Sequence, residues 1–486
     1  MTVRHLTSLP LVLSLVGGCT VGPDFQTPKP PEIAGYGKDI APPPAGGTTQ
    51  RLVPGQDVAG DWWHLFQSEP LNALVRQALA NNPTMAAGQA ALRQARENVA
   101  AQQGFYYPSV SAGIEASRNL TPLAALSPTG PNGNPYYSLV TPQLNVSFTP
   151  DVFGANRRAV ESLQAQADNQ RFMLEATWVT LTSNIVAAAI QEASLRGQIE
   201  AIGHTVRIES DLLKILNTQL RFGQVSGADV AAQEAALALA QQQLPPLRKQ
   251  LAQQRDALIA LAGRFPDDDI AQKFDLGSFR LPTELPVSLP ADLVKQRPDV
   301  RQAEENLHAA SANIGQAVAA RLPQITLTAQ VGNSANSPGN LFTPATNFWS
   351  LTGGLTQPVF DGFALMHRQR AARAAFDQAA AEYRSTVLAA FQNVADALRA
   401  LQSDADAVNA ASAAEQAAGR SLAIARKQLQ LGQVAYLVLL NAQNAYAQAQ
   451  LSQVQSRAVR LADTAALFQA LGGGWWHRPP DSAGDP

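Results

Sequence analysis

Few side chains in this 486-residue sequence have the types and spacing that catalysis or metal binding requires. The six His residues are scattered and never form a His-x-x-x-His pair, the spacing that places two imidazoles on one face of a helix. The run Asp267-Asp268-Asp269 lies in a predicted loop, where solvation is a better interpretation than cation binding. No Ser, His and Asp stand out as a nucleophilic triad, and no glycine-rich stretch has the strand-to-helix setting of a nucleotide loop. We therefore predict no enzyme activity, no metal and no cofactor.

Cys19 is the only thiol, and its surroundings give it a specific chemistry. A basic start and the apolar run 6–16 lead to Val16-Gly17-Gly18-Cys19, as in a cleaved secretory signal. Val-Gly-Gly-Cys resembles a bacterial lipobox, in which the Cys becomes the lipidated first residue of the mature protein and acyl chains such as palmitate hold it at a membrane. We predict a signal peptide over 1–18 and a covalent lipid on Cys19; the alternative is a plain signal peptide with an incidental thiol. Val21 stands where an Asp commonly marks inner-membrane retention, so we expect the outer membrane.

Composition excludes two further classes. The formal net charge is −2 and no Lys/Arg-rich stripe is present, so we expect no nucleic-acid partner. We find no apolar stretch that should cross a bilayer as a helix. Proline and glycine concentrate in 19–60, predicted to be an extended tether from the lipid, and in the linker 266–290. Residues 473–486 are predicted to be a flexible tail.

Between these segments the chain repeats itself. Three motif pairs show this: Asn82-Pro83-Thr84 with Arg297-Pro298-Asp299, Tyr107-Pro108-Ser109-Val110 with Leu322-Pro323-Gln324-Ile325, and Gln219-Leu220-Arg221-Phe222-Gly223-Gln224-Val225 with Gln428-Leu429-Gln430-Leu431-Gly432-Gln433-Val434. The first two pairs are 215 positions apart and the third is 209 apart. We therefore assign repeat 1 to 61–265 and repeat 2 to 291–472.

Each repeat is predicted to contain a helix, a β-hairpin, a long helix, a tip turn and a returning helix. In repeat 1 these are a hairpin at 105–150, a long helix at 155–219, a turn at 220–228 and a helix at 229–262; in repeat 2 they are 321–360, 364–428, 429–437 and 438–470. Each long helix is free of proline for more than 60 residues. At about 1.5 Å per residue, each would extend roughly 95 Å.

The hairpins alternate apolar and polar residues, which gives each strand two different faces. Ile325, Leu327 and Val331 alternate with polar residues in repeat 2, and Val110, Ala112 and Ile114 do so in repeat 1. An ordinary surface hairpin could show the same pattern. Aromatic residues near the hairpin ends favour a membrane barrel with interfacial girdles: Phe105, Tyr106, Tyr107, Tyr136, Tyr137, Phe348 and Trp349. The connections 119–138 and 334–347 are then the outward loops.

Four strands cannot close a barrel, and an open edge is not tolerated in lipid because unpaired backbone groups cost several kcal/mol each. The barrel must therefore be shared between copies of the chain. A dimer or a larger oligomer is required, and a trimer would supply about 12 strands.

Several motifs resemble those of the TolC-like outer-membrane factors of tripartite efflux systems, in particular the NodT/OprM-like lipoprotein branch. They are Cys19-Thr20-Val21-Gly22-Pro23-Asp24-Phe25, Trp62-Trp63 with Phe66, Arg297-Pro298-Asp299-Val300-Arg301 and Leu355-Thr356-Gln357-Pro358-Val359-Phe360-Asp361-Gly362. The resemblance covers nearly the whole chain. It implies a mainly α fold with a transmembrane portion, in which a homotrimer forms a β-barrel of about 12 strands continuous with a long periplasmic α-helical barrel. It also implies a periplasmic adaptor, an inner-membrane RND-type transporter and outer-membrane lipids as partners.

The implied function is a passive exit duct for drugs or other small molecules, gated at the periplasmic helix tips. The candidate gate residues are Gly223, Gln224, Val225, Ser226, Asp229, Gly432, Gln433, Val434, Ala435, Tyr436 and Leu437. Relatives often carry an acidic residue where this sequence has Val434, so a hydrophobic constriction is expected here instead of a carboxylate ring. The alternative is that Val434 and Leu437 only pack the turn. Two other functions stay open: the exit duct of a type I protein-secretion system, and a structural coiled-coil lipoprotein that spans the envelope.

Overall fold

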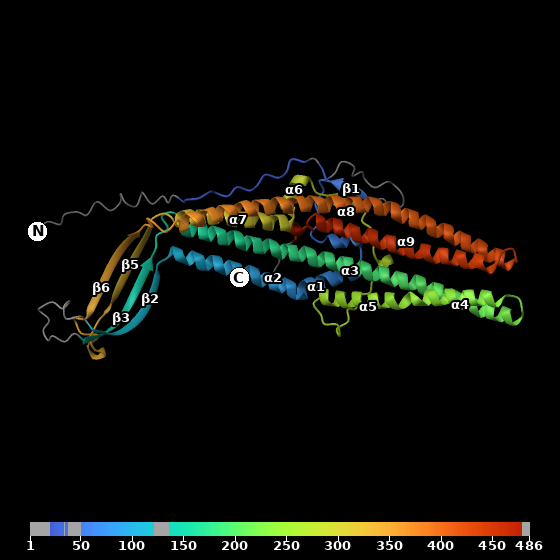
Figure 1. Ribbon diagram of the computed structural model, residues 1–486, viewed down its shortest axis with the longest axis horizontal. Helices are drawn as coiled ribbons and strands as arrows, with labels where there is room; N and C mark the ends of the chain where they lie inside the picture. The colour runs from blue at the N-terminus through green and yellow to red at the C-terminus, as the bar shows by residue number, and fades with distance from the viewer. Residues whose placement is uncertain (1–19, 34, 37–49, 121–135, 479–486) are drawn as a thin grey trace. The chain divides into compact units, whose positions relative to one another are not determined.

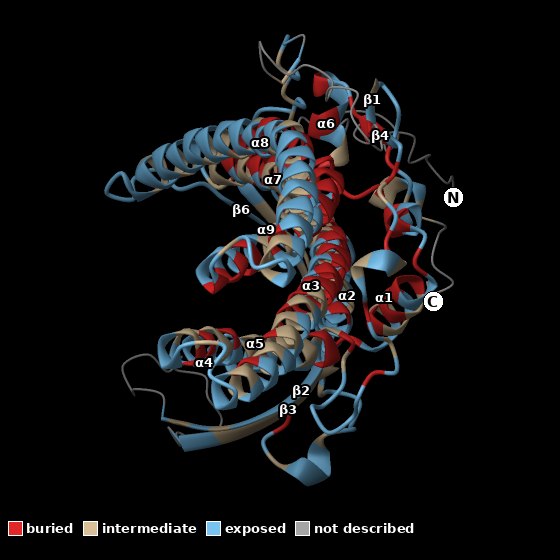
Figure 2. Cartoon of the chain, turned by 90° about the vertical axis from the view of Figure 1, so that its right-hand side faces the viewer, coloured by how far each residue is buried: buried red, intermediate tan, exposed pale blue. Residues whose placement is uncertain are grey.

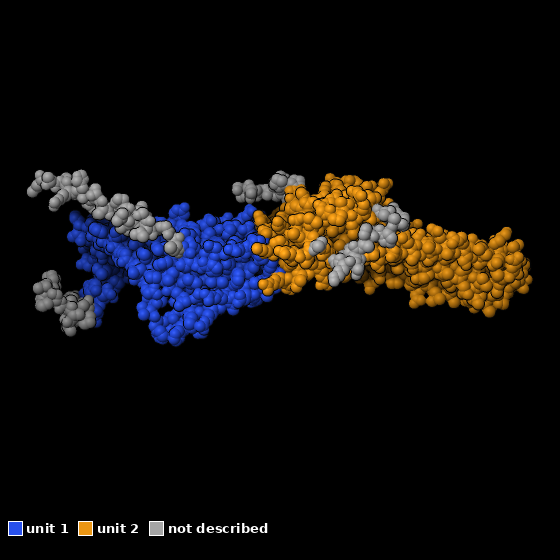
Figure 3. All heavy atoms as spheres, turned by 90° about the horizontal axis from the view of Figure 1, so that it is seen from above, with its two compact units in different colours: residues 1–28, 91–170, 303–383 blue, residues 29–90, 171–302, 384–486 orange. Residues whose placement is uncertain are grey.

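The computed structural model of the chain describes residues 20–33, 35, 36, 50–120 and 136–478. The chain divides into two compact units, coloured separately in Figure 3. Unit 1 comprises 1–28, 91–170 and 303–383, and unit 2 comprises 29–90, 171–302 and 384–486. The predicted signal peptide, Cys19 and most of the loop predicted at 119–138 lie outside the described residues.

Unit 1 contains one antiparallel sheet in the order β2-β3-β5-β6 (Figure 1). The strands are β2 (Ser109–Leu120), β3 (Tyr136–Phe148), β5 (Gln324–Asn333) and β6 (Asn347–Thr356). Directly paired residues share a face of a sheet. Ala112 pairs with Leu144, Leu144 with Val331, and Val331 with Trp349, so one apolar face continues across all four strands. The alternation predicted from the sequence is therefore present in both hairpins.

This apolar face is open to the surroundings in the single chain. Val110 and Ile114 on β2 are 68% and 77% exposed, and Leu351 and Leu355 on β6 are exposed as well. The two outer strands, β2 and β6, have no further partner strand among the described residues. An exposed apolar face of this extent is characteristic of an interaction surface or a lipid-facing one.

The helices follow the repeat. They are α1 (Glu69–Asn81), α2 (Pro83–Gln103), α3 (Ala155–Arg221), α4 (Gly227–Gln242), α5 (Leu244–Leu261), α6 (Pro290–Gln296), α7 (Pro298–Ala319), α8 (Ala364–Gln430) and α9 (Tyr436–Ala470). α3 and α8 each have 67 residues and begin 209 positions apart. Proline opens α2 and α7, where its missing N–H has no intrahelical acceptor to lose. Figure 2 shows buried residues along α1 and α3, whereas most of α8 is exposed or half-buried.

Two expectations about helices are wrong. The helix predicted over 229–262 is two helices, α4 and α5, because Pro245 and Pro246 cannot donate backbone hydrogen bonds to the preceding turn. The sequence also contains a stretch that could cross a membrane by length and composition, and it lies in α3. Most of that stretch is buried, which is also expected of a core helix.

The tether is more ordered than predicted within unit 2. β1 (Arg51–Pro54) pairs in parallel with β4 (Glu284–Val287), so part of the predicted tether 19–60 forms a strand with part of the linker 266–290. Ile270, Phe274 and Leu285 of the linker are buried. Composition alone missed these contacts because Pro- and Gly-rich segments can still pack when tertiary partners are present.

The first part of the predicted tail 473–486 is also fixed in unit 2. The indole N–H of Trp475 donates to the Gln296 carbonyl at 2.7 Å, and that of Trp476 donates to the Asp57 carboxylate at 3.1 Å. His477 Nε2 lies 2.6 Å from the same carboxylate. The prediction of flexibility is therefore wrong for 473–478, and 479–486 lie outside the described residues.

Candidate functional site

The site predicted at the helix tips consists of two turns in unit 2. The first turn (222–226) joins α3 to α4, and the second turn (431–435) joins α8 to α9. Each contains a glycine in the left-handed region, Gly223 with φ +68° and Gly432 with φ +69°, a conformation that residues with a Cβ rarely adopt.

Both turns close their helix with the same pair of hydrogen bonds. In the first turn, the Gln224 N–H donates to the Gln219 carbonyl and the Gly223 N–H donates to that of Leu220, both at 2.9 Å. The second turn repeats the pair 209 positions later, at 2.9 and 3.0 Å. This is the Schellman arrangement, which satisfies carbonyl groups left unpaired at a helix end. The two tips are thus equivalent at the point where the chain turns.

The first turn is followed by a complete capping box. The Ser226 hydroxyl accepts from the Asp229 N–H at 3.2 Å, and the Asp229 carboxylate accepts from the Ser226 N–H at 3.0 Å. Two N–H groups at the start of α4 are satisfied locally, and the negative charge of Asp229 lies at the positive end of the helix dipole. Asp229, predicted as a gate residue, therefore has a structural role in this chain.

The second turn has no such cap. Ala435 precedes α9 without a side-chain hydrogen bond, and Tyr436 is only 8% exposed. The Tyr436 hydroxyl donates to the side-chain oxygen of Gln233 on α4, and the Gln233 amide donates to the Glu209 carbonyl on α3 at 2.8 Å. The ring packs in an apolar cluster with Leu216 of α3, Val230 of α4 and Leu439 and Leu440 of α9. The start of α9 is thus fixed by contacts with α3 and α4.

Burial shifts the pKa values of both acidic groups at this contact upward. Burial raises the pKa of Glu209, although the hydrogen bond from Gln233 and the positive charge of Arg426 oppose the rise. Burial, together with the negative charges of Glu209 and Asp229, also raises the pKa of Tyr436. Tyr436 therefore keeps its proton and acts as a hydrogen-bond donor throughout the physiological range.

The predicted gate residues fall into three classes of exposure. Gly223, Gln224, Ser226, Gly432, Gln433, Ala435 and Leu437 are exposed; Val225, Asp229 and Val434 are half-buried; Tyr436 is buried. Sequence reasoning missed Glu209 and Gln233, because their contacts join positions far apart in the chain. It also missed the exposed apolar residues Phe222 and Leu431, although both directly precede the turn glycine and the repeat alone could have identified them. Among the described residues, no group of His, Cys, Asp and Glu could hold a metal ion.

These features, two glycine-closed helical hairpins and a sheet with an exposed apolar face, define a class of envelope channel. A model of the outer membrane efflux protein family matches residues 74–264 and 289–473. The match covers well over half of the chain, which therefore belongs to this family. The protein is an outer-membrane efflux channel that extends into the periplasm. Family membership also confirms the prediction of a duct instead of an enzyme.

Two relatives and a solved structure match nearly the whole chain. The probable efflux pump outer membrane protein TtgC of Pseudomonas putida is 28% identical over 98% of this chain and 96% of its own length. SepC, also described as a probable efflux pump outer membrane protein of Pseudomonas putida, is 30% identical over 97% of both chains. The structure of the outer-membrane channel OprN superposes with a TM-score of 0.84 at 25% identity, covering 94% of this chain and all of that one.

Proposed function

We propose that three copies of this chain form a closed channel that passively conducts drugs or other small molecules from an inner-membrane RND-type transporter and a periplasmic adaptor to the cell exterior. The observation that carries this proposal is the open four-stranded sheet, with one continuous apolar face and two outer strands that have no further partner in the described part of the chain. Pairing β6 of one copy with β2 of the next would satisfy both edges, and three copies would give about 12 strands.

The oligomer is tested by measuring the mass of the purified protein in detergent. We expect three times the mass of the mature chain. A stable monomer with an intact, protease-resistant sheet would contradict the edge argument.

The two turns are proposed to form the periplasmic gate, with Val434 as a hydrophobic constriction. Val434 is half-buried and follows the turn glycine by two residues, which leaves part of its side chain available to line a pore. Channels carrying Val434→Asp or Val434→Ala are compared with wild type in planar bilayers. A polar or smaller side chain should raise the closed-state leak; an unchanged leak in both variants would show that Val434 only packs the turn.

The lipid on Cys19 remains part of the proposal. It is supported by the sequence around Cys19 alone, and the mass of the mature chain tests it directly. The expected chain starts at Cys19 and carries the added mass of its acyl groups.

Protein secretion through the same duct is the second candidate function, and the names of the relatives favour efflux over it. A structural coiled-coil lipoprotein would have unbroken heptads and no sheet, which the four described strands of unit 1 contradict. Deleting the gene and measuring accumulation of a fluorescent dye separates efflux from protein secretion, since only the loss of an efflux duct should raise dye retention.

A further inference from the structure

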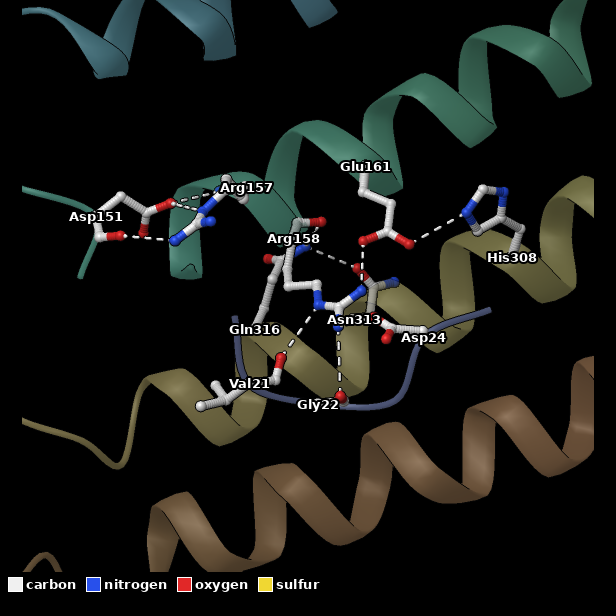
Figure 4. Close-up of polar contacts among 10 residues, drawn as sticks. All are labelled: Val21, Gly22, Asp24, Asp151, Arg157, Arg158, Glu161, His308, Asn313 and Gln316. Atoms are coloured by element: carbon white, nitrogen blue, oxygen red, sulfur yellow. Dashed lines mark hydrogen bonds and ion pairs between the residues drawn. The ribbon is translucent and has the colours of Figure 1, made fainter. Parts of the chain in front are cut away.

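The segment that directly follows Cys19 is held in unit 1 by one buried arginine (Figure 4). The Arg158 side chain, on the first turn of α3, is only 4% exposed. It donates to the Val21 carbonyl at 3.1 Å, to the Gly22 carbonyl at 3.3 Å and to the Asp24 carboxylate at 2.7 Å. Three of its contacts therefore bind one short stretch of chain that lies more than 130 positions away in the sequence.

Neighbouring groups hold Arg158 in place. The Glu161 carboxylate accepts from it at 2.7 Å and also lies 3.2 Å from Nε2 of His308 on α7. The His308 ring stacks on Phe25 at a centroid distance of 4.4 Å. Glu161 supplies the better-shielded countercharge for this guanidinium, since its side chain is 26% exposed and that of Asp24 is 92% exposed. Arg158, Glu161 and His308 are called the N-terminal clamp below.

A glycine in the segment allows its backbone to come close enough for this contact. Gly22 has φ +99°, and a Cβ at this position would lie 2.4 Å from the Gly315 Cα on α7. The Val21 N–H also donates to the Phe153 carbonyl, at 3.2 Å, in the connection between β3 and α3. The segment is thus fixed by backbone as well as side-chain contacts at the place where strand changes to helix.

Chain geometry then limits the position of any group carried by Cys19. Two residues span at most about 7 Å, so a lipid on Cys19 would be attached within that distance of Val21. The next hydrogen bond from a described side chain of this segment to a distant part of the chain is from Tyr36 to the Ser288 carbonyl. A flexible segment of that length, from 19 to 36, has a root-mean-square reach of roughly 23 Å. The N-terminal clamp therefore reduces the reach of a lipid anchor on Cys19 about threefold.

We propose that Arg158 is the positioning residue that holds the lipid-bearing end of the chain at the junction between β3 and α3, and so sets the level at which the membrane surface meets the sheet. The proposal rests on the lipidation proposed above. It assigns the segment 21–25 a role distinct from the rest of the tether: this part is a fixed attachment point.

Hydrogen exchange of the full-length, detergent-purified protein tests the clamp. Arg158→Gln should speed exchange of the amides at 20–25 at least tenfold, while exchange at 160–170 and the oligomer mass stay unchanged. Arg157→Gln is the matched control, because its side chain is 40% exposed and pairs with Asp151 instead of the N-terminal segment. Gly22→Ala, a change outside the helices, should reproduce the effect of Arg158→Gln.

A distance measurement distinguishes positioning of the N-terminal segment from a general effect of Arg158 on stability. Spin labels at Gln26→Cys and Gln164→Cys should give a narrow distance distribution that Arg158→Gln broadens. Unchanged exchange at 20–25 together with a narrow distribution in Arg158→Gln would overturn the clamp. The mass of the mature chain separates the two proposals: a chain without lipid overturns the anchor and the inference with it, whereas a lipidated chain with an unaltered N-terminal segment in Arg158→Gln overturns the clamp alone.

Discussion

α3 and α8 have the same length and end in the same glycine turn, but the helices that follow them begin differently. α4 starts with the Ser226–Asp229 capping box. α9 is preceded by Ala435 at the equivalent position, and it has Val438 where α4 has Asp229. The first residue of α9, Tyr436, is instead buried against Gln233 of α4.

The difference shows how one repeat can diverge without changing its fold. The first helical hairpin (α3 and α4) satisfies the N–H groups at the start of α4 with its own side chains. The second helical hairpin (α8 and α9) relies on tertiary contacts with the first, through Tyr436 and the apolar cluster around Leu439. A movement that separates the hairpins would therefore loosen the start of α9 while leaving the start of α4 intact.

The largest expected effect comes from removing the tertiary contact. Tyr436→Ala should destabilise the start of α9 by about 3–5 kcal/mol, and Tyr436→Phe by about 1–3 kcal/mol because Gln233 loses its buried partner. Amide exchange at 432–442 gives the local opening free energy. Phe222→Ala is the control, since this side chain is 75% exposed and should change stability by no more than about 0.5 kcal/mol. Equal destabilisation by Tyr436→Ala and Phe222→Ala would contradict the difference between the two turns.

A second effect concerns a half-buried aspartate that has no acidic counterpart at the equivalent position of the first repeat. Asp404 on α8 stands where α3 has the buried Leu195. Burial, a hydrogen bond with Asp463 and repulsion from Asp463 raise the pKa of Asp404 to about 7, although Arg460 opposes the rise. Between about pH 4, the value in the unfolded chain, and about pH 7, the folded chain keeps a proton that the unfolded chain has lost. Stability should therefore fall as the pH rises through this window.

Asp404→Asn removes this dependence. At pH 8 the variant should be more stable than wild type by about 1–2 kcal/mol, a figure reduced for the partial exposure of the site, and the two should converge near pH 4. Thermal unfolding between pH 4 and pH 9 measures both. Asp396→Asn, an exposed aspartate on the same helix, should keep the slope of wild type. A wild-type slope in Asp404→Asn would place the titrating group elsewhere.

The smallest effect is that of the cap itself. Ser226→Ala should cost about 1 kcal/mol at the start of α4. Conversely, Ala435→Ser with Val438→Asp should build a capping box on α9 and stabilise it by about 0.5–1 kcal/mol. Exchange of the first amides of each helix reports both changes. If the start of α9 is no more stable in the double variant than in wild type, the second turn must differ from the first in more than its cap.

Much of this architecture could be predicted from sequence because it depends on local rules. The proline-free runs predicted the two long helices at 155–219 and 364–428, and α3 and α8 occupy Ala155–Arg221 and Ala364–Gln430. Gly223 and Gly432 marked the turns for the same reason, since few residues other than glycine accept that backbone conformation. Period-two alternation predicted the strands, whose pairs then align in one register.

The failures concern contacts between positions far apart in the chain. Trp475, Trp476 and His477 look like part of a loose tail until Asp57 and Gln296 are brought beside them. The contact between Tyr436 and Gln233 was likewise not predicted, because the two residues lie 203 positions apart. Composition and periodicity report what a segment can do by itself, and neither reports which distant polar group will meet it.

The equal lengths of α3 and α8 restrict how the gene for such a chain can evolve. Deleting one residue from α3 would draw its turn back by about 1.5 Å and rotate it by about 100°, so that Gln233 would no longer meet Tyr436. A compensating deletion in α8 would restore the match. Insertions and deletions should therefore be inherited in pairs, one in each hairpin, and lineages whose channels differ in reach should differ by the same number of residues in both.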